Sequence, residues 1–117
     1  MRRGEVAAVR AAAWTLMELA RLRRALRRDG IGARAVRPPR RPPPVGARGV
    51  FWVLRRRKAT CLERSLLLQA WYAAQGQRRD VVIGVTAPNA GFTAHAWLDG
   101  DPAEADGPYR ELHRLAP

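Results

Sequence analysis

The sequence contains a single cysteine, Cys61, among its 117 residues. One cysteine cannot form an internal disulfide, and it excludes zinc sites built from four cysteines. No apolar run approaches the roughly 18 residues that a membrane-spanning helix needs, so we expect no membrane association. Arg10 and Glu18 interrupt the apolar stretch near the N-terminus, and no small-residue cleavage site follows, so we expect no secretory signal. These absences favour a soluble protein of the reducing cytoplasm.

Acidic residues are scarce in most of the chain. Residues 1–79 hold 20 basic and four acidic side chains, a net charge of +16, whereas residues 80–117 hold two basic and six acidic ones, a net charge of −4. Lysine is nearly absent as well, because 21 of the 22 basic residues are arginine and the exception is Lys58. Hydrophobic residues make up 47% of the chain, which is typical of one small globular domain. The basic part predicts contact with an acidic partner.

Patterning divides the chain into three segments. Residues 1–32 contain an amphipathic helix over 5–28, with glycines directly after its end. Its predicted apolar face consists of Val9, Ala12, Ala13, Leu16, Leu19, Ala20 and Leu26. Residues 33–48 are rich in proline and arginine, which predicts an extended connector rather than a helix or central strand. Residues 49–117 form the predicted core domain.

The basic segments allow two interpretations each. The arginines near the end of the first helix either form a solvated face that suits the helix dipole or also dock an acidic partner. The connector is either a plain linker or a docking arm, in which Arg40 and Arg41 would contact an acidic partner. A nucleic-acid-binding module is the alternative of a different class, but only Phe51 and Trp52 lie near the arginines for base stacking. A nucleic acid is therefore not the expected partner.

The clearest local signal surrounds the cysteine. Thr60 and Glu63 satisfy the capping-box pattern, which predicts a helix over 61–75 that is apolar enough to be central. Cys61 then occupies the first helical position, where backbone N–H groups and the helix dipole favour a thiolate, as would the cations at 57–58. The alternative is a structural cysteine buried among leucines.

Two strands are predicted after this helix. Residues 80–85 form a β-branched run typical of a buried strand, and residues 92–98 alternate between apolar positions and a face that carries His95 and Trp97. Turn-forming residues separate the two runs, which favours an antiparallel hairpin. Residues 109–115 fit either a last strand or a helical turn. The expected fold class is α+β.

Cys61 and His95 form the candidate catalytic pair. A cysteine at a helix N-terminus opposed by a histidine on a strand is the arrangement of a thiol nucleophile and its base. Small alanines flank His95 and leave room for such an approach, although a lone histidine on a strand is more often structural. The Cys61 N–H can donate one hydrogen bond to an oxyanion. Residues 1–60 contain neither Asn nor Gln, so a second donor would be another backbone N–H or the Trp52 indole.

A third group is needed to orient the imidazole. The acids that follow His95 are Asp99, Asp101, Glu104 and Asp106. Asp99 lies too far along the strand, whereas Asp106 follows a turn that can fold back beside the histidine. Each of these acids, taken singly, is more often simply solvated.

Three blocks together resemble the lasso-peptide leader-peptidase family, whose core is similar to transglutaminases and papain-like cysteine proteases. The blocks are Cys61-Leu-Glu-Arg-Ser-Leu-Leu-Leu68, Val82-Ile-Gly-Val85 and Ala94-His-Ala-Trp-Leu98. The resemblance covers about residues 45–115. It implies a transglutaminase-like α+β core in which a central helix packs on a small antiparallel sheet, with the N-terminal helix before it.

The resemblance also implies a function. Cys61 would be the nucleophile, His95 the base and Asp106 the third member, although Ala105 stands where the family usually has Asn. The family removes the leader segment from a ribosomally synthesised precursor peptide, without a cofactor or metal. It works beside a separate leader-recognition protein and an ATP-using macrolactam cyclase. No recognition domain precedes the core, which implies the stand-alone protease of a split system. Another acyl-transfer enzyme with the same triad is the closest alternative.

Overall fold

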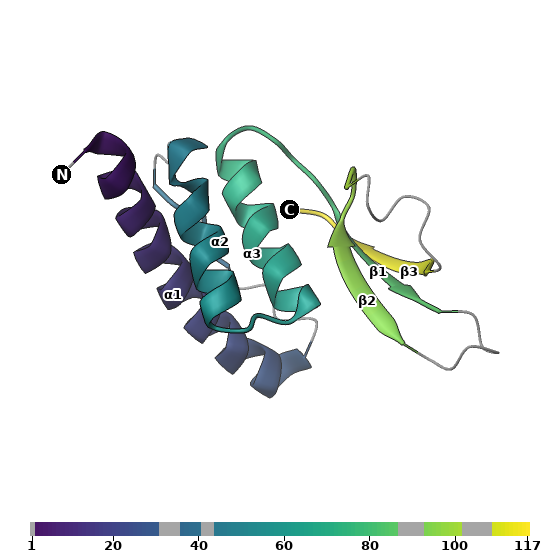
Figure 1. Ribbon diagram of the computed structural model, residues 1–117. Helices are drawn as coiled ribbons and strands as arrows, with labels where there is room; N and C mark the ends of the chain where they lie inside the picture. Colours follow the sequence, from purple (N-terminus) through teal and green to yellow (C-terminus); the bar gives the residue numbers. More distant parts are fainter. Residues whose placement is uncertain (1, 31–35, 41–43, 87–92, 102–108) are drawn as a thin grey trace.

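Three helices and a three-stranded sheet make up the described part of the chain, so the fold is α+β (Figure 1). The computed structural model describes residues 2–30, 36–40, 44–86, 93–101 and 109–117. In chain order the elements are α1 (Arg3–Asp29), the 3-10 turn η2 (Pro44–Gly46), α2 (Ala47–Arg56), α3 (Cys61–Ala74), β1 (Val81–Val85), β2 (Ala94–Leu98) and β3 (Arg110–Leu115). The helices lie in the order α1, α2, α3, and the sheet stands beyond α3.

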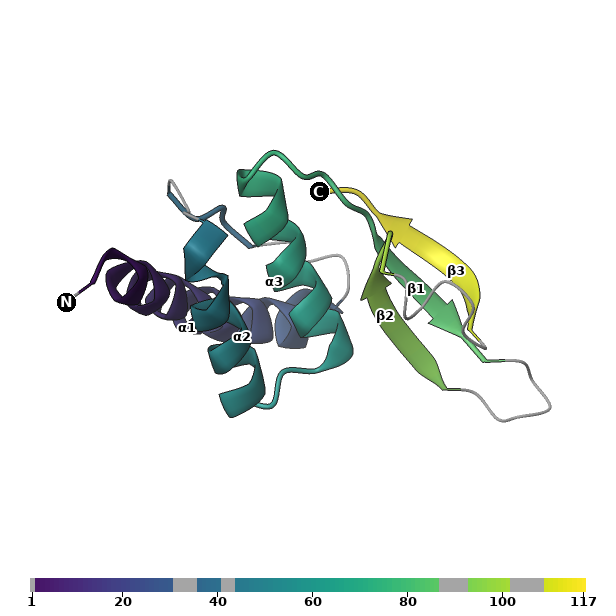
Figure 2. The ribbon, with the colours of Figure 1, turned by 45° about the horizontal axis from the view of Figure 1, so that its top comes forward.

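The sheet is antiparallel with the strand order β2-β1-β3. The predicted hairpin is confirmed, since β1 pairs with β2 in a register that places His95 opposite Gly84 and Trp97 opposite Val82. The last segment is a strand, not a helical turn, because β3 pairs with the other edge of β1. The strand that packs against α3 is mainly β2, at the edge of the sheet (Figure 2). This contact brings the start of α3 and the middle of β2 into one neighbourhood.

The packing of α1 on α2 depends on glycine. A side chain at Gly49 would collide with the backbone carbonyl of Ala8, and one at Gly46 would press on the Ala7 carbonyl. The two helices therefore approach so closely that small residues form the contact. The buried positions of α1 are correspondingly small or polar for the most part: Ala7, Ala11, Thr15, Glu18, Leu19, Leu22 and Ala25.

The predicted apolar face of α1 is therefore largely wrong. Val9 and Leu16 are exposed, and only Leu19 of the predicted large residues is fully buried. Polar side chains take buried positions instead, because each has partners. The Thr15 hydroxyl donates to the Ala11 carbonyl at 2.7 Å, and the Glu18 carboxylate accepts a hydrogen bond from Arg21 at 3.1 Å.

The connector is anchored to α1 over its described residues 36–40. The Arg37 backbone N–H donates to Glu18 at 2.6 Å, and the Arg37 carbonyl accepts from the Trp14 indole at 3.0 Å. Arg40 is exposed, and Arg41 lies outside the described residues. The connector ends earlier than predicted, because α2 begins at Ala47 and turns the apolar run at 50–54 into a helix. No helix in the described part of the chain is long and apolar enough to cross a bilayer.

An exposed arginine joins three carboxylates at the end of the sheet. Arg114 lies 2.7 Å from Glu111, 2.8 Å from Asp99 and 3.4 Å from Asp80. Hydrogen bonds from Arg114 lower the pKa of Asp99 and the pKa of Glu111 below their ordinary values. A carboxyl whose pKa is lower in the folded state contributes stability above its unfolded pKa, near 4, and loses it as the pH falls through the folded value.

We therefore expect Arg114→Ala to lower the melting temperature by at most a few degrees near pH 7, since exposed ion pairs are weak. The difference from the wild type should vanish near pH 2, where the carboxyls are protonated in both proteins. Thermal unfolding followed by circular dichroism measures this. Arg110→Ala, an exposed arginine of the same strand, serves as the control and should show no pH-dependent difference. A difference for Arg114→Ala that persists in acid would contradict the account.

Candidate active site

The start of α3 is a complete capping box, as predicted. The Glu63 backbone N–H donates to the Thr60 hydroxyl at 3.2 Å, and the Thr60 N–H donates to the Glu63 carboxylate at 3.0 Å. Thr60 is extended and Cys61 is the first residue of the helix. The cysteine is free and half-buried. Its thiol therefore sits at the positive end of a 14-residue helix, where negative charge is favoured.

An ion pair from α1 holds this capping box in place. Arg23 donates to both carboxylate oxygens of Glu63 at 3.2 Å, and also to the Arg57 carbonyl at 2.8 Å. Glu63 is buried, so the pair is shielded from water on the carboxylate side. The end of α1 is thereby fixed to the start of α3 and to the loop before it. Sequence reasoning missed Arg23, because the residue lies 40 positions from Glu63.

Replacing Arg23 with alanine should leave the buried Glu63 carboxylate with the Thr60 N–H as its one remaining partner among the described residues, and we expect a loss of about 1–2 kcal/mol in the free energy of unfolding. Urea denaturation measures it. Arg24→Ala is a matched control, since Arg24 is the next residue of α1 and is exposed. Equal stability of the Arg23 and Arg24 variants would show that the ion pair does not hold the helix end.

Two aromatic rings hold His95 on β2. The imidazole stacks on Trp97 at 5.7 Å between ring centroids and lies 4.9 Å from the Tyr109 ring. Trp97 in turn covers Gly84, where a Cβ atom would come within 2.7 Å of the indole. Glycine at that position of β1 thus lets the Trp97 ring lie against the strand. The imidazole is confined by packing on the face that the strand alternation predicts.

Cys61 and His95 line the same cavity, although they belong to different elements. The cavity has a volume of about 350 Å³. We call it the shared cavity; its other lining residues are Phe51, Arg64, Ser65, Leu68, Tyr72, Arg79, Ala96, Trp97, Leu98, Gly100 and Asp101. Because α3 packs on the edge strand β2, Cys61 at the start of the helix and His95 on the strand both border this cavity. Aromatic and apolar side chains form much of its wall.

Two arginines that line the shared cavity make cation–π contacts with aromatic rings. The Arg64 guanidinium lies 5.4 Å from the centre of the Phe51 ring, and that of Arg79 lies 4.9 Å from the Tyr72 ring. Arg57 and Lys58 were expected to be the cations beside the thiol, but both are exposed and neither lines the cavity. Position 64 follows the cysteine by three residues, so helical spacing alone could have identified Arg64.

Of the four acids that follow His95, the structure describes two, Asp99 and Asp101. Asp106 and Glu104 lie outside the described residues. Asp99 forms the ion pair with Arg114 described above, whereas Asp101 lines the shared cavity. In the part of the chain that the structure describes, no three His, Cys, Asp or Glu side chains are placed to hold a metal ion.

Trp52 is not placed to donate a hydrogen bond to an oxyanion in the shared cavity. Its side chain is exposed and lines a different cavity, with Leu16, Val53, Arg56 at the end of α2 and Arg57 directly after it. Phe51, not Trp52, borders the shared cavity, which favours the other alternative, a backbone N–H, as the second donor. The first N–H groups of a helix have no partner within the helix, and the capping box uses the one of Glu63. The N–H groups of Cys61 and Leu62 are the nearest candidates.

Comparison with known proteins adds one finding. A family model described as the Transglutaminase-like superfamily matches residues 6–117. The match takes in α1, α2, α3 and all strands of the described sheet, and so includes both Cys61 and His95. No curated protein and no solved structure matches the chain.

Proposed function

We propose, on the premise that the chain belongs to the transglutaminase-like superfamily, that it is a cysteine peptidase with Cys61 as nucleophile and His95 as general base. The superfamily generally has the fold of cysteine proteases and acyl-transfer enzymes. The observation that carries the proposal is the shared cavity, in which a thiol at a helix N-terminus and a strand histidine line one volume. This combination is the one that activates a thiol for attack on a carbonyl.

The proposed reaction has two halves. His95 takes the Cys61 proton, the sulfur attacks the peptide carbonyl carbon, and the C–N bond breaks as the imidazolium gives its proton to the departing amine. A water molecule, deprotonated by His95, then attacks the thioester. The C–S bond breaks, the thiol is restored, and the products are a carboxylic acid and a free amine. Backbone N–H groups at the start of α3 would donate to the tetrahedral oxyanion.

The proposed substrate is the leader–core junction of a ribosomally synthesised precursor peptide. Support comes from the three sequence blocks that resemble leader peptidases, which include the Cys61 and His95 positions. Apolar and aromatic walls suit a peptide side chain, and Arg64 and Arg79 can bind its carbonyl or carboxylate oxygens. In this proposal a separate leader-recognition protein presents the precursor, and a macrolactam cyclase consumes the core peptide through its new free amine.

The test uses a ribosomally synthesised precursor peptide with a leader segment, together with a leader-recognition protein. Both are to be sought among the genes next to the one that encodes this chain. Mass spectrometry of the mixture should find two fragments whose masses sum to the precursor plus one water. Adding a primary amine in excess distinguishes transfer from hydrolysis, since a transferase would join the amine to the leader fragment. Intact precursor in the presence of all components would overturn the proposed substrate, and an amine adduct as the main product would favour acyl transfer.

We propose Asp106 as the residue that orients the His95 imidazole, with Asp101 as the alternative. Asp106→Asn should lower kcat by about 10²–10⁴-fold, because the imidazole loses the partner that holds its tautomer. Asp101→Asn should cost less than about tenfold, and so should Glu104→Gln. Steady-state cleavage of the precursor measures all three variants. The reverse order, with the large loss at Asp101, would assign the role to the acid on the cavity wall.

A further inference from the structure

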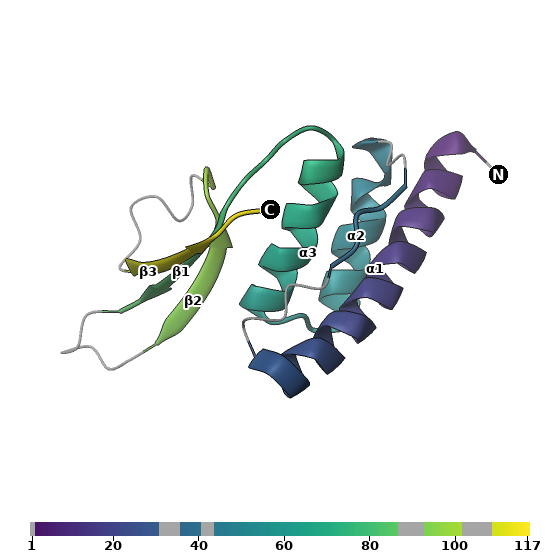
Figure 3. The same cartoon turned by 180° about the vertical axis from the view of Figure 1, so that it is seen from behind.

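The outward face of α1 carries apolar side chains that are exposed to solvent rather than buried in the core. Val6 is 40% exposed, Val9 60%, Leu16 36% and Met17 63%. The opposite face of the helix holds its buried residues and packs on α2 and α3. Seen from either side, the N-terminal part of α1 is the outermost part of the helical layer and lies far from the sheet, whereas the end of α1 passes below α3 (Figure 3).

These side chains follow the spacing of a coiled-coil seam. Positions 6, 9, 13, 16 and 20 are separated alternately by three and four residues, and they hold Val6, Val9, Ala13, Leu16 and Ala20. All five are exposed. Such alternation places side chains in one row that fits a second helix, with the alanines allowing close approach. We call these five residues the outer seam.

A neighbouring aromatic side chain widens the outer seam. Trp52 of α2 is 54% exposed and lines a cavity of about 320 Å³ together with Leu16. Large apolar residues on two helices thus form one surface, which is unusual for a face that meets only water. Exposed tryptophan beside a hollow is also typical of the residues that dominate protein–protein binding.

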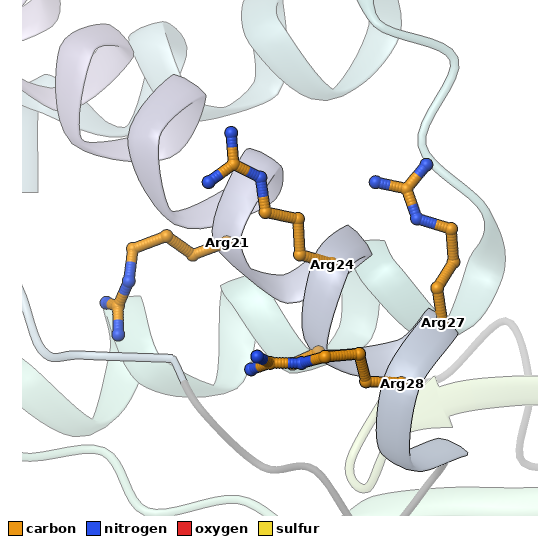
Figure 4. Close-up of a pocket in the computed structure, with 5 residues that line it drawn as sticks. Arg21, Arg24, Arg27 and Arg28 are labelled. Atoms are coloured by element: carbon orange, nitrogen blue, oxygen red, sulfur yellow. The ribbon is translucent and has the colours of Figure 1, made fainter.

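The outer seam leads into a basic cluster at the end of α1. Arg24 and Arg27 follow Ala20 by four and seven residues and so continue the same face. They line a cavity of about 470 Å³ with Arg21 and Arg28, and in Figure 4 the side chains of Arg24 and Arg27 both extend upward from the helix. Arg21 is held by Glu18, whereas no carboxylate among the described residues pairs with Arg24 or Arg27.

We infer that the outer seam and the basic cluster dock an amphipathic helix of another protein, with apolar residues along its seam and carboxylates at the end that meets Arg24 and Arg27. Charge favours this occupant over a second copy of the chain. The net charge is +12, and parallel pairing would bring each arginine pair against its own counterpart. Antiparallel pairing would bring Arg24 and Arg27 of one copy close to Arg2 and Arg3 of the other copy.

The outer seam is separate from the site of the proposed chemistry. The outer seam lies on the far side of the helical layer from the shared cavity, which is built from α3 and β2. Substitutions in the seam should therefore leave the reaction of Cys61 with iodoacetamide unchanged. A loss of docking and a loss of thiol reactivity can thus be observed separately.

Fluorescence anisotropy on the full chain tests the inference with a labelled helical peptide of about three heptads. It carries leucine at seam positions, glutamate at the end that would meet Arg24 and Arg27, and alanine and glutamine elsewhere. A scrambled peptide of equal composition lacks the seam. The paired substitutions Val9→Ser with Leu16→Ser, and Arg24→Glu with Arg27→Glu, should each weaken binding at least about tenfold. Arg110→Glu on β3 should not, and circular dichroism confirms that each variant is folded.

Three outcomes would overturn the inference. The first is absence of binding, or equal binding of the scrambled peptide, which would show that binding does not depend on the outer seam. The second is self-association of the wild type, measured by sedimentation equilibrium, that the seam substitutions abolish; the occupant would then be a second copy. The third is tighter binding of a uridine oligonucleotide than of the peptide, dependent on the arginines and not on the seam.

Discussion

Replacing Cys61 with alanine is expected to lower the rate of precursor cleavage by at least about 10⁴-fold. The proposed reaction forms a covalent bond to the Cys61 sulfur, and no other cysteine in the chain can take its place. The residue is exposed to solvent only in part and lies at a helix end, so alanine should fit without disturbing the fold. Single-turnover cleavage measured by mass spectrometry covers the required range.

Ser65 offers a matched control for the cysteine. It lines the same cavity one turn further along α3, and its hydroxyl is the other aliphatic nucleophile on that wall. Ser65→Ala should keep the cleavage rate within about tenfold of the wild type. An active Cys61→Ala protein beside an inactive Ser65→Ala protein would transfer the nucleophile's role to the serine and overturn the proposed mechanism.

Replacing His95 with alanine is expected to lower the same rate by about 10³-fold or more. The variant lacks the group that takes the thiol proton and later protonates the departing amine. Added imidazole should restore part of the rate, because the small molecule can occupy the space that the side chain leaves between Trp97 and Tyr109. Rescue of this kind distinguishes a missing base from a damaged fold.

The second histidine provides the control. His113 lies on β3 and is exposed, so His113→Ala should cleave the precursor at the wild-type rate. Thiol reactivity gives a second measurement, since His95→Ala should slow alkylation of Cys61 by iodoacetamide near neutral pH while His113→Ala should not. Equal alkylation and cleavage rates in the two variants would contradict the pairing of His95 with the thiol.

Local interactions explain why part of the site was predictable from sequence. The capping box needs only Thr60 and Glu63, three residues apart, so the start of α3 and the place of Cys61 were predicted correctly. The hairpin likewise follows from two apolar runs separated by turn residues. Alternation along β2 then determines which face carries His95.

The incorrect predictions concern contacts between distant segments. Large apolar residues were assigned to the buried face of α1, but the close approach of Gly49 to Ala8 selects small residues there and leaves Val9 and Leu16 exposed. The burial of Glu18 could not be foreseen, because its partner is the backbone N–H of Arg37 in the connector. Tertiary packing overrides the simple rule that large apolar side chains face the core.

The arginines that position and line the site could not be recognised from the sequence for the same reason. Arg23 holds Glu63 from 40 residues away, and Arg79 enters the shared cavity from the segment after α3. Neither residue stands out in a sequence with 22 basic side chains, so only the fold distinguishes them from the exposed arginines.

The most direct test of the central claim is the intact mass of the protein after rapid acid quenching of a reaction with excess precursor. A Cys61 acyl-enzyme predicts a transient increase equal to the leader fragment minus one water, located on the peptide that contains Cys61 and removed by hydroxylamine. The adduct should be absent from Cys61→Ala and accumulate less in His95→Ala. Cleavage that proceeds without an adduct, and continues in Cys61→Ala, would show that the thiol is not the nucleophile.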